Sequence, residues 1–180
     1  MNHQLFKNNL QKGFTLVELL VVLALSGVAG TIILVSLSNT FRNASKSDSV
    51  STIQQNGNFV MSQLTRMIRF ASDLQLPTSC YTGSSTPVAS TSITILNQDN
   101  LPTTFACDTG NGSIASNGAN LLNSQAVTVT ACTFSCIQTS PYDSPTMTVS
   151  FTLNKKNGNS AVENNSPIVF TSSVNMRNAR

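Results

Sequence analysis

FTLVELLVVLALSGVAGTIILVSL, residues 14–37, is the stretch from which the fold of this chain follows. It holds about 24 mostly apolar residues, and as an α-helix it would be roughly 36 Å long, enough to cross a hydrocarbon core of about 30 Å. The residues before it are polar and basic, and Lys7 and Lys12 orient that end towards the cytoplasm. We therefore predict a single transmembrane helix, with the bulk of the chain on the far side of the membrane.

One acid, Glu18, lies close to the start of this apolar run. A charged side chain costs about 2.5 to 3.5 kcal/mol near the middle of a bilayer and less near the interface, whereas each Leu, Ile, Val or Phe gains about 0.3 to 0.6 kcal/mol. The span can therefore carry Glu18 as a tolerated interfacial charge. Acids inside membrane spans are usually functional, however, so we expect a role for this carboxylate.

The run KGFTLVELL, residues 12–20, closely resembles the processing signal (class III prepilin signal) of type IV pilins and pseudopilins. In that family a membrane-embedded prepilin peptidase cuts after the glycine and methylates the new N-terminal phenylalanine. The resemblance implies cleavage between Gly13 and Phe14, N-methylation of Phe14, and Glu18 as the fifth residue of the mature chain. Residues 1–13 would then be a leader peptide that is removed.

A physical role for Glu18 follows from this resemblance. When the helix leaves the membrane for the core of a filament, the carboxylate needs a cation, and the amine freed at Phe14 of a neighbouring subunit can supply one. Attraction in a low dielectric is strong, and either charge buried alone would be costly. We therefore expect Glu18 to set the axial register between subunits.

Beyond the membrane span the helix is predicted to continue with one apolar face until Pro77 ends it. The apolar positions recur at steps of three and four residues: Val50, Ile53, Val60, Leu64, Met67, Ile68, Ala71 and Leu74.

The predicted helix has three weak places: Gly27, Gly30 and the run Asn56-Gly57-Asn58. Bending or local melting is expected there, since each Gly in a helix costs about 0.8 to 1.0 kcal/mol relative to Ala. For Gly27, close packing against another helix is the alternative explanation.

After Pro77 the sequence changes to short alternating segments that are typical of half-buried strands. Strands are expected at 91–97 and 103–107, paired across the turn at 98–100, and at 127–134, 147–153 and 168–176, with a further turn at Asn157-Gly158. The segments 83–92 and 110–120 are interpreted as surface loops.

The predicted fold is α+β and pilin-like, a long N-terminal helix packed against a C-terminal antiparallel β-sheet. Its parts are the leader (1–13), the transmembrane or filament-core helix (14–37), the amphipathic continuation (38–76) and a β-rich head (77–180).

The four cysteines, Cys80, Cys107, Cys132 and Cys136, all lie in the part placed outside the cytoplasm, which favours two disulfides. Four cysteines allow three connectivities. We favour Cys80 with Cys107 and Cys132 with Cys136, because the second pair is local. A zinc site is the rival interpretation, although the spacing of Cys80 and Cys107 is unlike that of metal-binding knuckles.

Composition argues against catalysis and against polyanion binding. The one histidine, His3, lies in the leader, so the mature chain lacks the usual base of catalytic triads, and we expect no enzyme activity, no metal and no cofactor. The head carries four basic and four acidic residues, so nucleic-acid binding is not expected unless Lys155, Lys156, Arg177 and Arg180 cluster in space.

Two further stretches narrow the resemblance. Residues 55–60 with 64–69, and the ending 174–178, are similar to PilW-like minor pilins and J-type minor pseudopilins. The resemblance implies an assembly subunit that primes or caps a type IV pilus or a type II secretion pseudopilus, residing first in the cytoplasmic membrane and then in the filament. Its partners would be the prepilin peptidase, other major and minor pilins and the inner-membrane assembly platform. A major pilin, an adhesin and a DNA-uptake subunit of a competence system are the alternatives.

Overall fold

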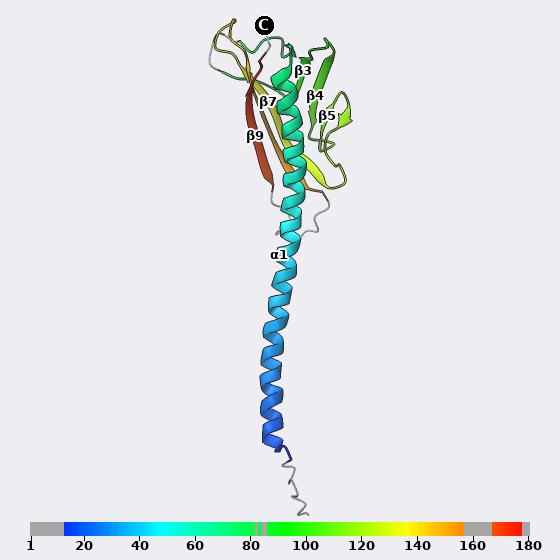
Figure 1. The fold of residues 1–180 in the computed structure, drawn as a ribbon, viewed down its shortest axis with the longest axis vertical. Coiled ribbons are helices and arrows are strands. Elements are labelled where there is room, and N and C mark those ends of the chain that lie inside the picture. Colours follow the sequence, from blue (N-terminus) through cyan, green and yellow to red (C-terminus); the bar gives the residue numbers. More distant parts are fainter. Residues whose placement is uncertain (1–12, 82, 84–85, 157–166, 178–180) are drawn as a thin grey trace, which may run out of the picture. The chain divides into compact units, whose positions relative to one another are not determined.

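The computed structural model describes residues 13–81, 83, 86–156 and 167–177. One long helix, α1, spans Leu16–Phe70, and antiparallel strands follow it (Figure 1). The strands are β1 (Asp73–Leu76), β2 (Val88–Ser90), β3 (Ser92–Leu96), β4 (Pro102–Asp108), β5 (Ser113–Ser116), β6 (Ala119–Asn120), β7 (Val127–Ile137), β8 (Thr146–Lys155) and β9 (Ile168–Asn175). The predicted α+β class is confirmed. The chain divides into two compact units, one up to Ala44 and one from Ser45 onwards.

In the second unit, α1 buries one stripe of side chains against the strands. Ile53, Val60, Leu64 and Ile68 are at most 1% exposed and join a core to which both sheets contribute. They follow one another at steps of seven, four and four residues, which keeps them on one face of a helix. Burying a large aliphatic side chain is worth about 1.5 to 3 kcal/mol, so this stripe contributes substantially to the stability of the head. The predicted amphipathic half of the helix is thereby confirmed for this segment.

The helix ends at Phe70, six residues earlier than the predicted Leu76. Ser72 turns the chain into the first sheet, because its backbone N–H donates to the carbonyl of Leu96 at 2.8 Å and its hydroxyl bonds the carbonyls of Leu96 and Asn97. Residues 73–76 then form β1 against β3. Leu74 fits the helical spacing of the stripe, but pairing with β3 overrides that local pattern.

The strands form two sheets rather than the one that was predicted. Sheet A has the order β1-β3-β4-β5-β6, and sheet B has the order β2-β7-β8-β9. The predicted hairpin at residues 98–100 is confirmed as the connection from β3 to β4, and β7, β8 and β9 lie close to their predicted positions. The predicted loops were wrong in part, because 83–92 contains β2 and 110–120 contains β5 and β6. The predicted turn at Asn157-Gly158 lies outside the described residues.

Two disulfides are present, as predicted, but their connectivity differs from the favoured one. Cys80 pairs with Cys136 and Cys107 pairs with Cys132, with Cα atoms 5.3 Å and 6.0 Å apart. Cys132 and Cys136 both lie on β7, where four residues of extended chain separate their Cα atoms by about 13 Å, well beyond the reach of about 7 Å. Cys107 on β4 instead reaches Cys132 on β7 and joins sheet A to sheet B.

The run Asn56-Gly57-Asn58 does not interrupt α1, so the expected local melting is not observed there. Gly57 is buried, and a Cβ at this position would overlap the ring of Phe170 on β9, which itself stacks on Phe151 with ring centroids 5.3 Å apart. The side chain of Asn56 accepts the backbone N–H of Asn123 at 3.2 Å. The absence of a side chain at Gly57 therefore lets β9 approach the helix, and this part of α1 is an anchor for the head.

We predict that peptide mapping of the oxidised chain without reduction will recover Cys80 linked to Cys136 and Cys107 linked to Cys132. Replacing both Cys107 and Cys132 by Ala should lower the free energy of unfolding by about 3 to 4 kcal/mol, because the cross-link closes a loop of 25 residues and so restricts the unfolded chain. Recovery of Cys80 linked to Cys107 would contradict this connectivity.

We predict that Gly57→Ala destabilises the head even though Ala favours helix. The new methyl group would push on the Phe170 ring, at a cost of about 1 to 3 kcal/mol, against a gain of about 0.5 to 1 kcal/mol from helix propensity. Thermal unfolding of the chain in detergent should show a lower Tm for Gly57→Ala. The same substitution at exposed Asn58 should leave Tm nearly unchanged, and adding Phe170→Leu should recover part of the loss. A Gly57→Ala chain with a higher Tm than the wild type would refute the proposed close approach.

Candidate functional site

The start of α1 is built around Thr15. Its hydroxyl accepts the backbone N–H of Glu18 at 3.3 Å, and its carbonyl accepts the N–H of Leu19 at 3.2 Å. Thr15 is therefore the N-cap of the helix, and Thr15-Leu16-Val17-Glu18 has the spacing of a capping box. Thr15 was not among the predicted site residues, although the pattern Thr-x-x-Glu before an apolar run is the signal that identifies such a cap.

Gly13, Phe14 and Glu18 lie together at this helix start. Phe14 stands just before the helix and is 82% exposed, and Glu18 occupies the first turn with its side chain exposed. Within the part of the chain that the structure describes, no basic group pairs with the Glu18 carboxylate. Its position in the first turn places a negative charge at the positive end of the helix dipole. A favourable interaction with the helix dipole is thus a second contribution of Glu18, beside the predicted pairing between subunits.

The helix that follows presents apolar side chains in every direction. From Phe14 to Leu37, fifteen large apolar residues are exposed, and the first buried residue along α1 is Ser49. Ser26 and Thr31 donate their hydroxyls to the carbonyls of Val22 and Val28, so these polar groups are satisfied within the helix. By length and composition, this part of α1 is suited to crossing a membrane, where backbone and hydroxyl groups must find partners inside the segment.

Gly27 and Gly30 lie inside the apolar segment without breaking it. The helix is continuous through both positions, and a Cβ at either one would meet no atom within 4 Å. The expected melting at these glycines is not observed. Small residues on an apolar helix allow another helix to approach closely, which is the packing alternative for Gly27.

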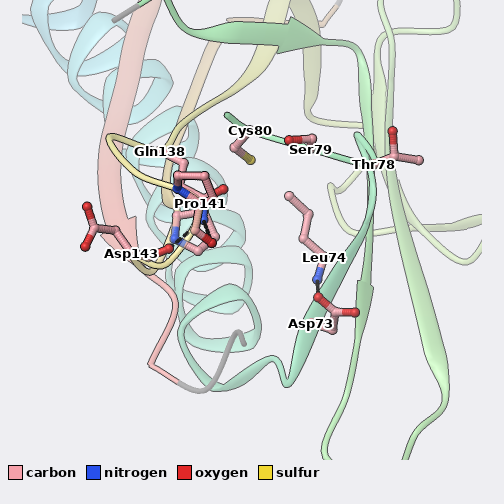
Figure 2. Close-up of a pocket in the computed structure, with 9 residues that line it drawn as sticks. Asp73, Leu74, Thr78, Ser79, Cys80, Gln138, Pro141 and Asp143 are labelled. Atoms are coloured by element: carbon pink, nitrogen blue, oxygen red, sulfur yellow. Dashed lines mark hydrogen bonds between the residues drawn. The ribbon is translucent and has the colours of Figure 1, made fainter. Parts of the chain in front are cut away.

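A small cavity of about 180 Å³ opens in the head between β1 and the end of β7. Figure 2 shows its lining, in which the carboxyl group of Asp143 points away from the other residues. The Asp73 carboxylate accepts the backbone N–H of Leu74 at 2.7 Å, and the Gln138 amide donates to the carbonyl of Asp143 at 2.6 Å. Both polar groups are therefore engaged by neighbouring backbone groups, and the lining brings no acid and base together.

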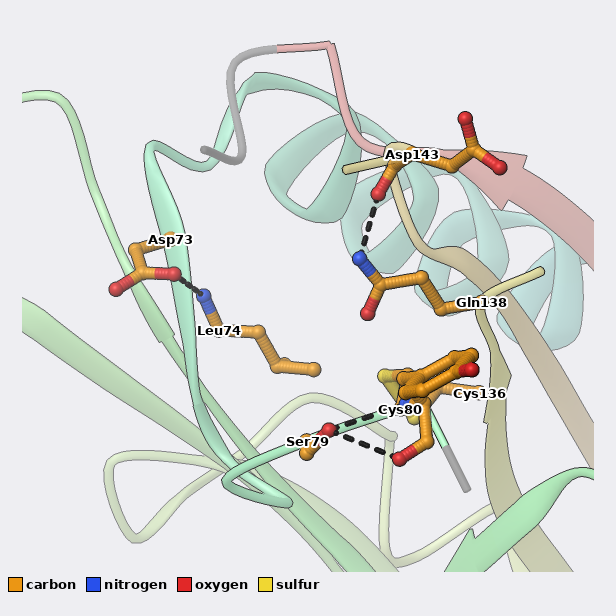
Figure 3. The surroundings of a disulfide bond; sticks show 8 residues. Asp73, Leu74, Ser79, Cys80, Cys136, Gln138 and Asp143 are labelled. Carbon is orange, nitrogen blue, oxygen red and sulfur yellow. Dashed lines mark hydrogen bonds between the residues drawn. A yellow bond between two sulfur atoms is a disulfide. The ribbon is translucent and has the colours of Figure 1, made fainter. Parts of the chain in front are cut away.

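The cavity adjoins the disulfide between Cys80 and Cys136 (Figure 3). Both cysteines are at most 2% exposed, and the bond ties the segment after β1 to the end of β7. All four thiols predicted as disulfide candidates are consumed in two such bonds, which removes the ligands that the rival zinc site would need.

The remaining titratable groups do not converge. Asp108 accepts the backbone N–H of Asn111 and, from the same residue, the side-chain amide; these bonds hold the pKa of this carboxyl below its usual value and stabilise the exposed turn between β4 and β5. Among the described residues, no group of three His, Cys, Asp or Glu side chains could hold a metal ion.

The candidate basic cluster is not assembled either. Lys155 ends β8, where its ammonium group donates to the Ser49 hydroxyl at 2.8 Å and lies 3.8 Å from the Asp48 carboxylate. Arg177 follows β9, next to the opposite end of β8, because Thr146 pairs with Asn175. The ten residues of β8 separate the two cations by about 30 Å. Arg180 lies outside the described residues.

Comparison with known proteins finds a match that covers the N-terminal segment. Residues 8–34 match the prokaryotic N-terminal methylation motif. No curated protein and no solved structure matches the chain. The matched segment contains Gly13, Phe14, the cap at Thr15, Glu18 and most of the uncovered apolar helix, so the chain carries an N-terminal methylation motif at the residues that the geometry singles out.

Proposed function

We propose that this chain is a pilin-type structural subunit. In this proposal it is made as a membrane-anchored precursor, cut between Gly13 and Phe14, methylated at Phe14, and moved from the membrane into a helical filament. The observation that carries the proposal is the methylation motif at residues 8–34, which coincides with a helix whose apolar side chains are exposed all round.

The apolar surface supplies the driving force. Each large side chain between Phe14 and Leu37 needs a cover that the described chain does not provide, and lipid or the helices of other subunits would satisfy it equally well. Transfer from lipid to a bundle of similar helices therefore costs little hydrophobic free energy. Packing at Gly27 and Gly30 and pairing of charges would then decide whether the subunit stays in the filament.

Glu18 is the residue to which we assign axial register. In the filament core its carboxylate would face the N-terminal amine that cleavage creates at Phe14 of a neighbouring subunit. Because an unpaired charge in such a core is costly, insertion at any other offset would be disfavoured. The cap at Thr15 is separate, since the Thr15 hydroxyl accepts the backbone N–H of residue 18 and does not depend on the side chain there.

We further propose a minor rather than a major subunit, which primes or caps a pilus or a type II secretion pseudopilus. The similarity of residues 55–60, 64–69 and 174–178 to minor pilins and pseudopilins supports this assignment. The prepilin peptidase, other pilins and the inner-membrane assembly platform would be its partners. A low abundance in sheared filaments, relative to the principal subunit, is expected; a major pilin would dominate them.

A DNA-binding or adhesive role is the less favoured alternative. The cations Lys155 and Arg177 lie at opposite ends of β8, and Lys155 is occupied by Ser49 and Asp48. Lys155 and Arg177 therefore do not join in one basic cluster on the described head, and we expect its DNA affinity to be weak.

We predict that Glu18→Gln is cleaved and methylated like the wild type but does not enter filaments. Gln can replace Glu in a capping box, so the helix start is preserved while the charge is lost. Immunoblots of membranes and sheared filaments, in a host with its own pilus machinery, measure both steps. Filament levels should fall at least tenfold.

Thr15→Val provides the matched control, since it removes the cap hydroxyl at a cost of about 0.5 to 2 kcal/mol and keeps the charge. This variant should still assemble. Normal assembly of Glu18→Gln would refute the register role, and failure of Thr15→Val alongside it would show that assembly depends on the helix cap instead.

A further inference from the structure

The two sheets have four edge strands, and three of them have features that protect them from pairing with another strand. β2 has three residues, β6 has two, and β1 has four residues with an irregular register against β3, an Asp at its start and Pro77 after it. Short length, irregular pairing, charge and proline are the devices by which proteins protect sheet edges from pairing with other chains. These edges are poor acceptors for an additional strand.

The fourth edge, β9, carries none of these devices. Its eight residues, IVFTSSVN, contain no charge, no proline and no glycine, and they pair with β8 from Ile168 to Asn175 without a register shift. A long, regular and uncharged edge of this kind is the type that pairs with a further strand. β9 therefore differs from the other edges of the same head.

Backbone geometry shows which groups β9 presents. The N–H of Met176 donates to the carbonyl of Pro145 at 3.2 Å, which makes these two residues a hydrogen-bonded pair of the antiparallel ladder. Such pairs alternate with non-hydrogen-bonded ones, so Val174, Ser172, Phe170 and Ile168 direct their N–H and C=O groups to β8. The N–H and C=O groups at positions 169, 171, 173 and 175 point the other way, to the free edge.

The side chains agree with this alternation. Thr146 with Asn175, Thr148 with Ser173, and Ser150 with Thr171 share side-chain hydrogen bonds of 2.8 to 3.0 Å. These are the closely spaced, non-hydrogen-bonded positions of the ladder, where opposite side chains approach most closely. The cross-strand bonds fix β9 in register against β8 and leave an ordered edge.

The residues of β9 whose backbone groups point to the free edge also carry exposed side chains on the outer face of sheet B. Val169 is 65% exposed, and Thr171, Ser173 and Asn175 are also exposed. For these four residues, no partner of the outward backbone groups is found in the part of the chain that the structure describes. Four N–H and four C=O groups in alternation, repeating every two residues or about 7 Å, match one kind of occupant, an extended polypeptide backbone.

We propose that β9 accepts an extended segment of a neighbouring filament subunit, which adds a fifth strand to sheet B. The inference rests on the proposed function, because a filament supplies such neighbours. The segment would span about seven residues, opposite 169–175, and would carry uncharged side chains where it meets the neutral outer face of β8 and β9. Its source would differ from β9 itself, because pairing of two β9 edges is isologous and closes a dimer, whereas a growing filament needs heterologous contacts.

The test places a photo-reactive phenylalanine analogue at Val169 in the full chain, expressed with its pilus machinery. A second chain carries the analogue at Ala89, which is exposed on the protected β2 edge of the same sheet. After irradiation, adducts in membranes and in sheared filaments are identified by mass spectrometry. An adduct between Val169 and another subunit should exceed the Ala89 adduct at least tenfold.

A pair of variants at one position then tests the backbone contact. Thr171→Pro removes an N–H that faces the free edge, whereas Thr171→Val keeps that N–H and loses the same hydroxyl. The Val169 adduct should fall at least tenfold with Thr171→Pro and persist with Thr171→Val, while both chains keep the disulfide between Cys107 and Cys132. Equal adducts at Ala89, no intermolecular adduct, insensitivity to proline, or adducts confined to the same chain or to β9 of a second copy would each overturn the inference.

The outcomes separate this inference from the proposed function. A chain that is present in filaments but gives no Val169 adduct refutes strand addition and leaves the pilin assignment intact. A Val169 adduct in membranes, from a chain that never reaches filaments, refutes the filament role and keeps β9 as a strand acceptor.

Discussion

From Leu16 to Leu37 the large apolar side chains of α1 are exposed, as is Phe14 just before it, and water is a poor solvent for such a surface. Lipid or other apolar helices must cover it, and under the proposed function both the location and the assembly of the subunit depend on this one requirement. Polar groups fit the same requirement, because Ser26 and Thr31 bond within the helix and Thr15 caps its start. Glu18 is the exception, since its charge has no partner among the described residues.

In the head, by contrast, the helix segment buries its apolar stripe against strands of the same chain. Ile53, Val60, Leu64 and Ile68 support two sheets that a disulfide joins, and Gly57 admits the ring of Phe170. The same helix therefore contributes a self-contained core in one unit and an uncovered surface in the other. The proposed function is assigned to the uncovered part. Under that proposal the head contributes the surface that neighbouring subunits would meet, and the free edge of β9 is its most distinctive element.

Sequence periodicity predicted the elements that local pattern determines. The sequence pattern predicted the apolar run, the amphipathic stripe and the alternating strands β7, β8 and β9. Burial on one face imposes a period of 3.6 residues on a helix and of 2 on a strand. Local pattern failed where distant pairing decides. Leu74 has helical spacing but joins β1, and residues 110–120 look like a loop but form the short strands β5 and β6. The disulfide partners could not be predicted, since they follow from the meeting of β4 and β7. The cap at Thr15 could have been predicted from the pattern Thr-x-x-Glu before the apolar run, but it was not.

The most direct test of the central claim is the mass of the N-terminal peptide of the chain, isolated from membranes of cells with an active prepilin peptidase. We predict a peptide that begins at Phe14 and carries one methyl group on its amine, an addition of about 14 Da. An intact chain that still begins at Met1 in those cells would contradict the proposal that the helix is trimmed and passed into a filament.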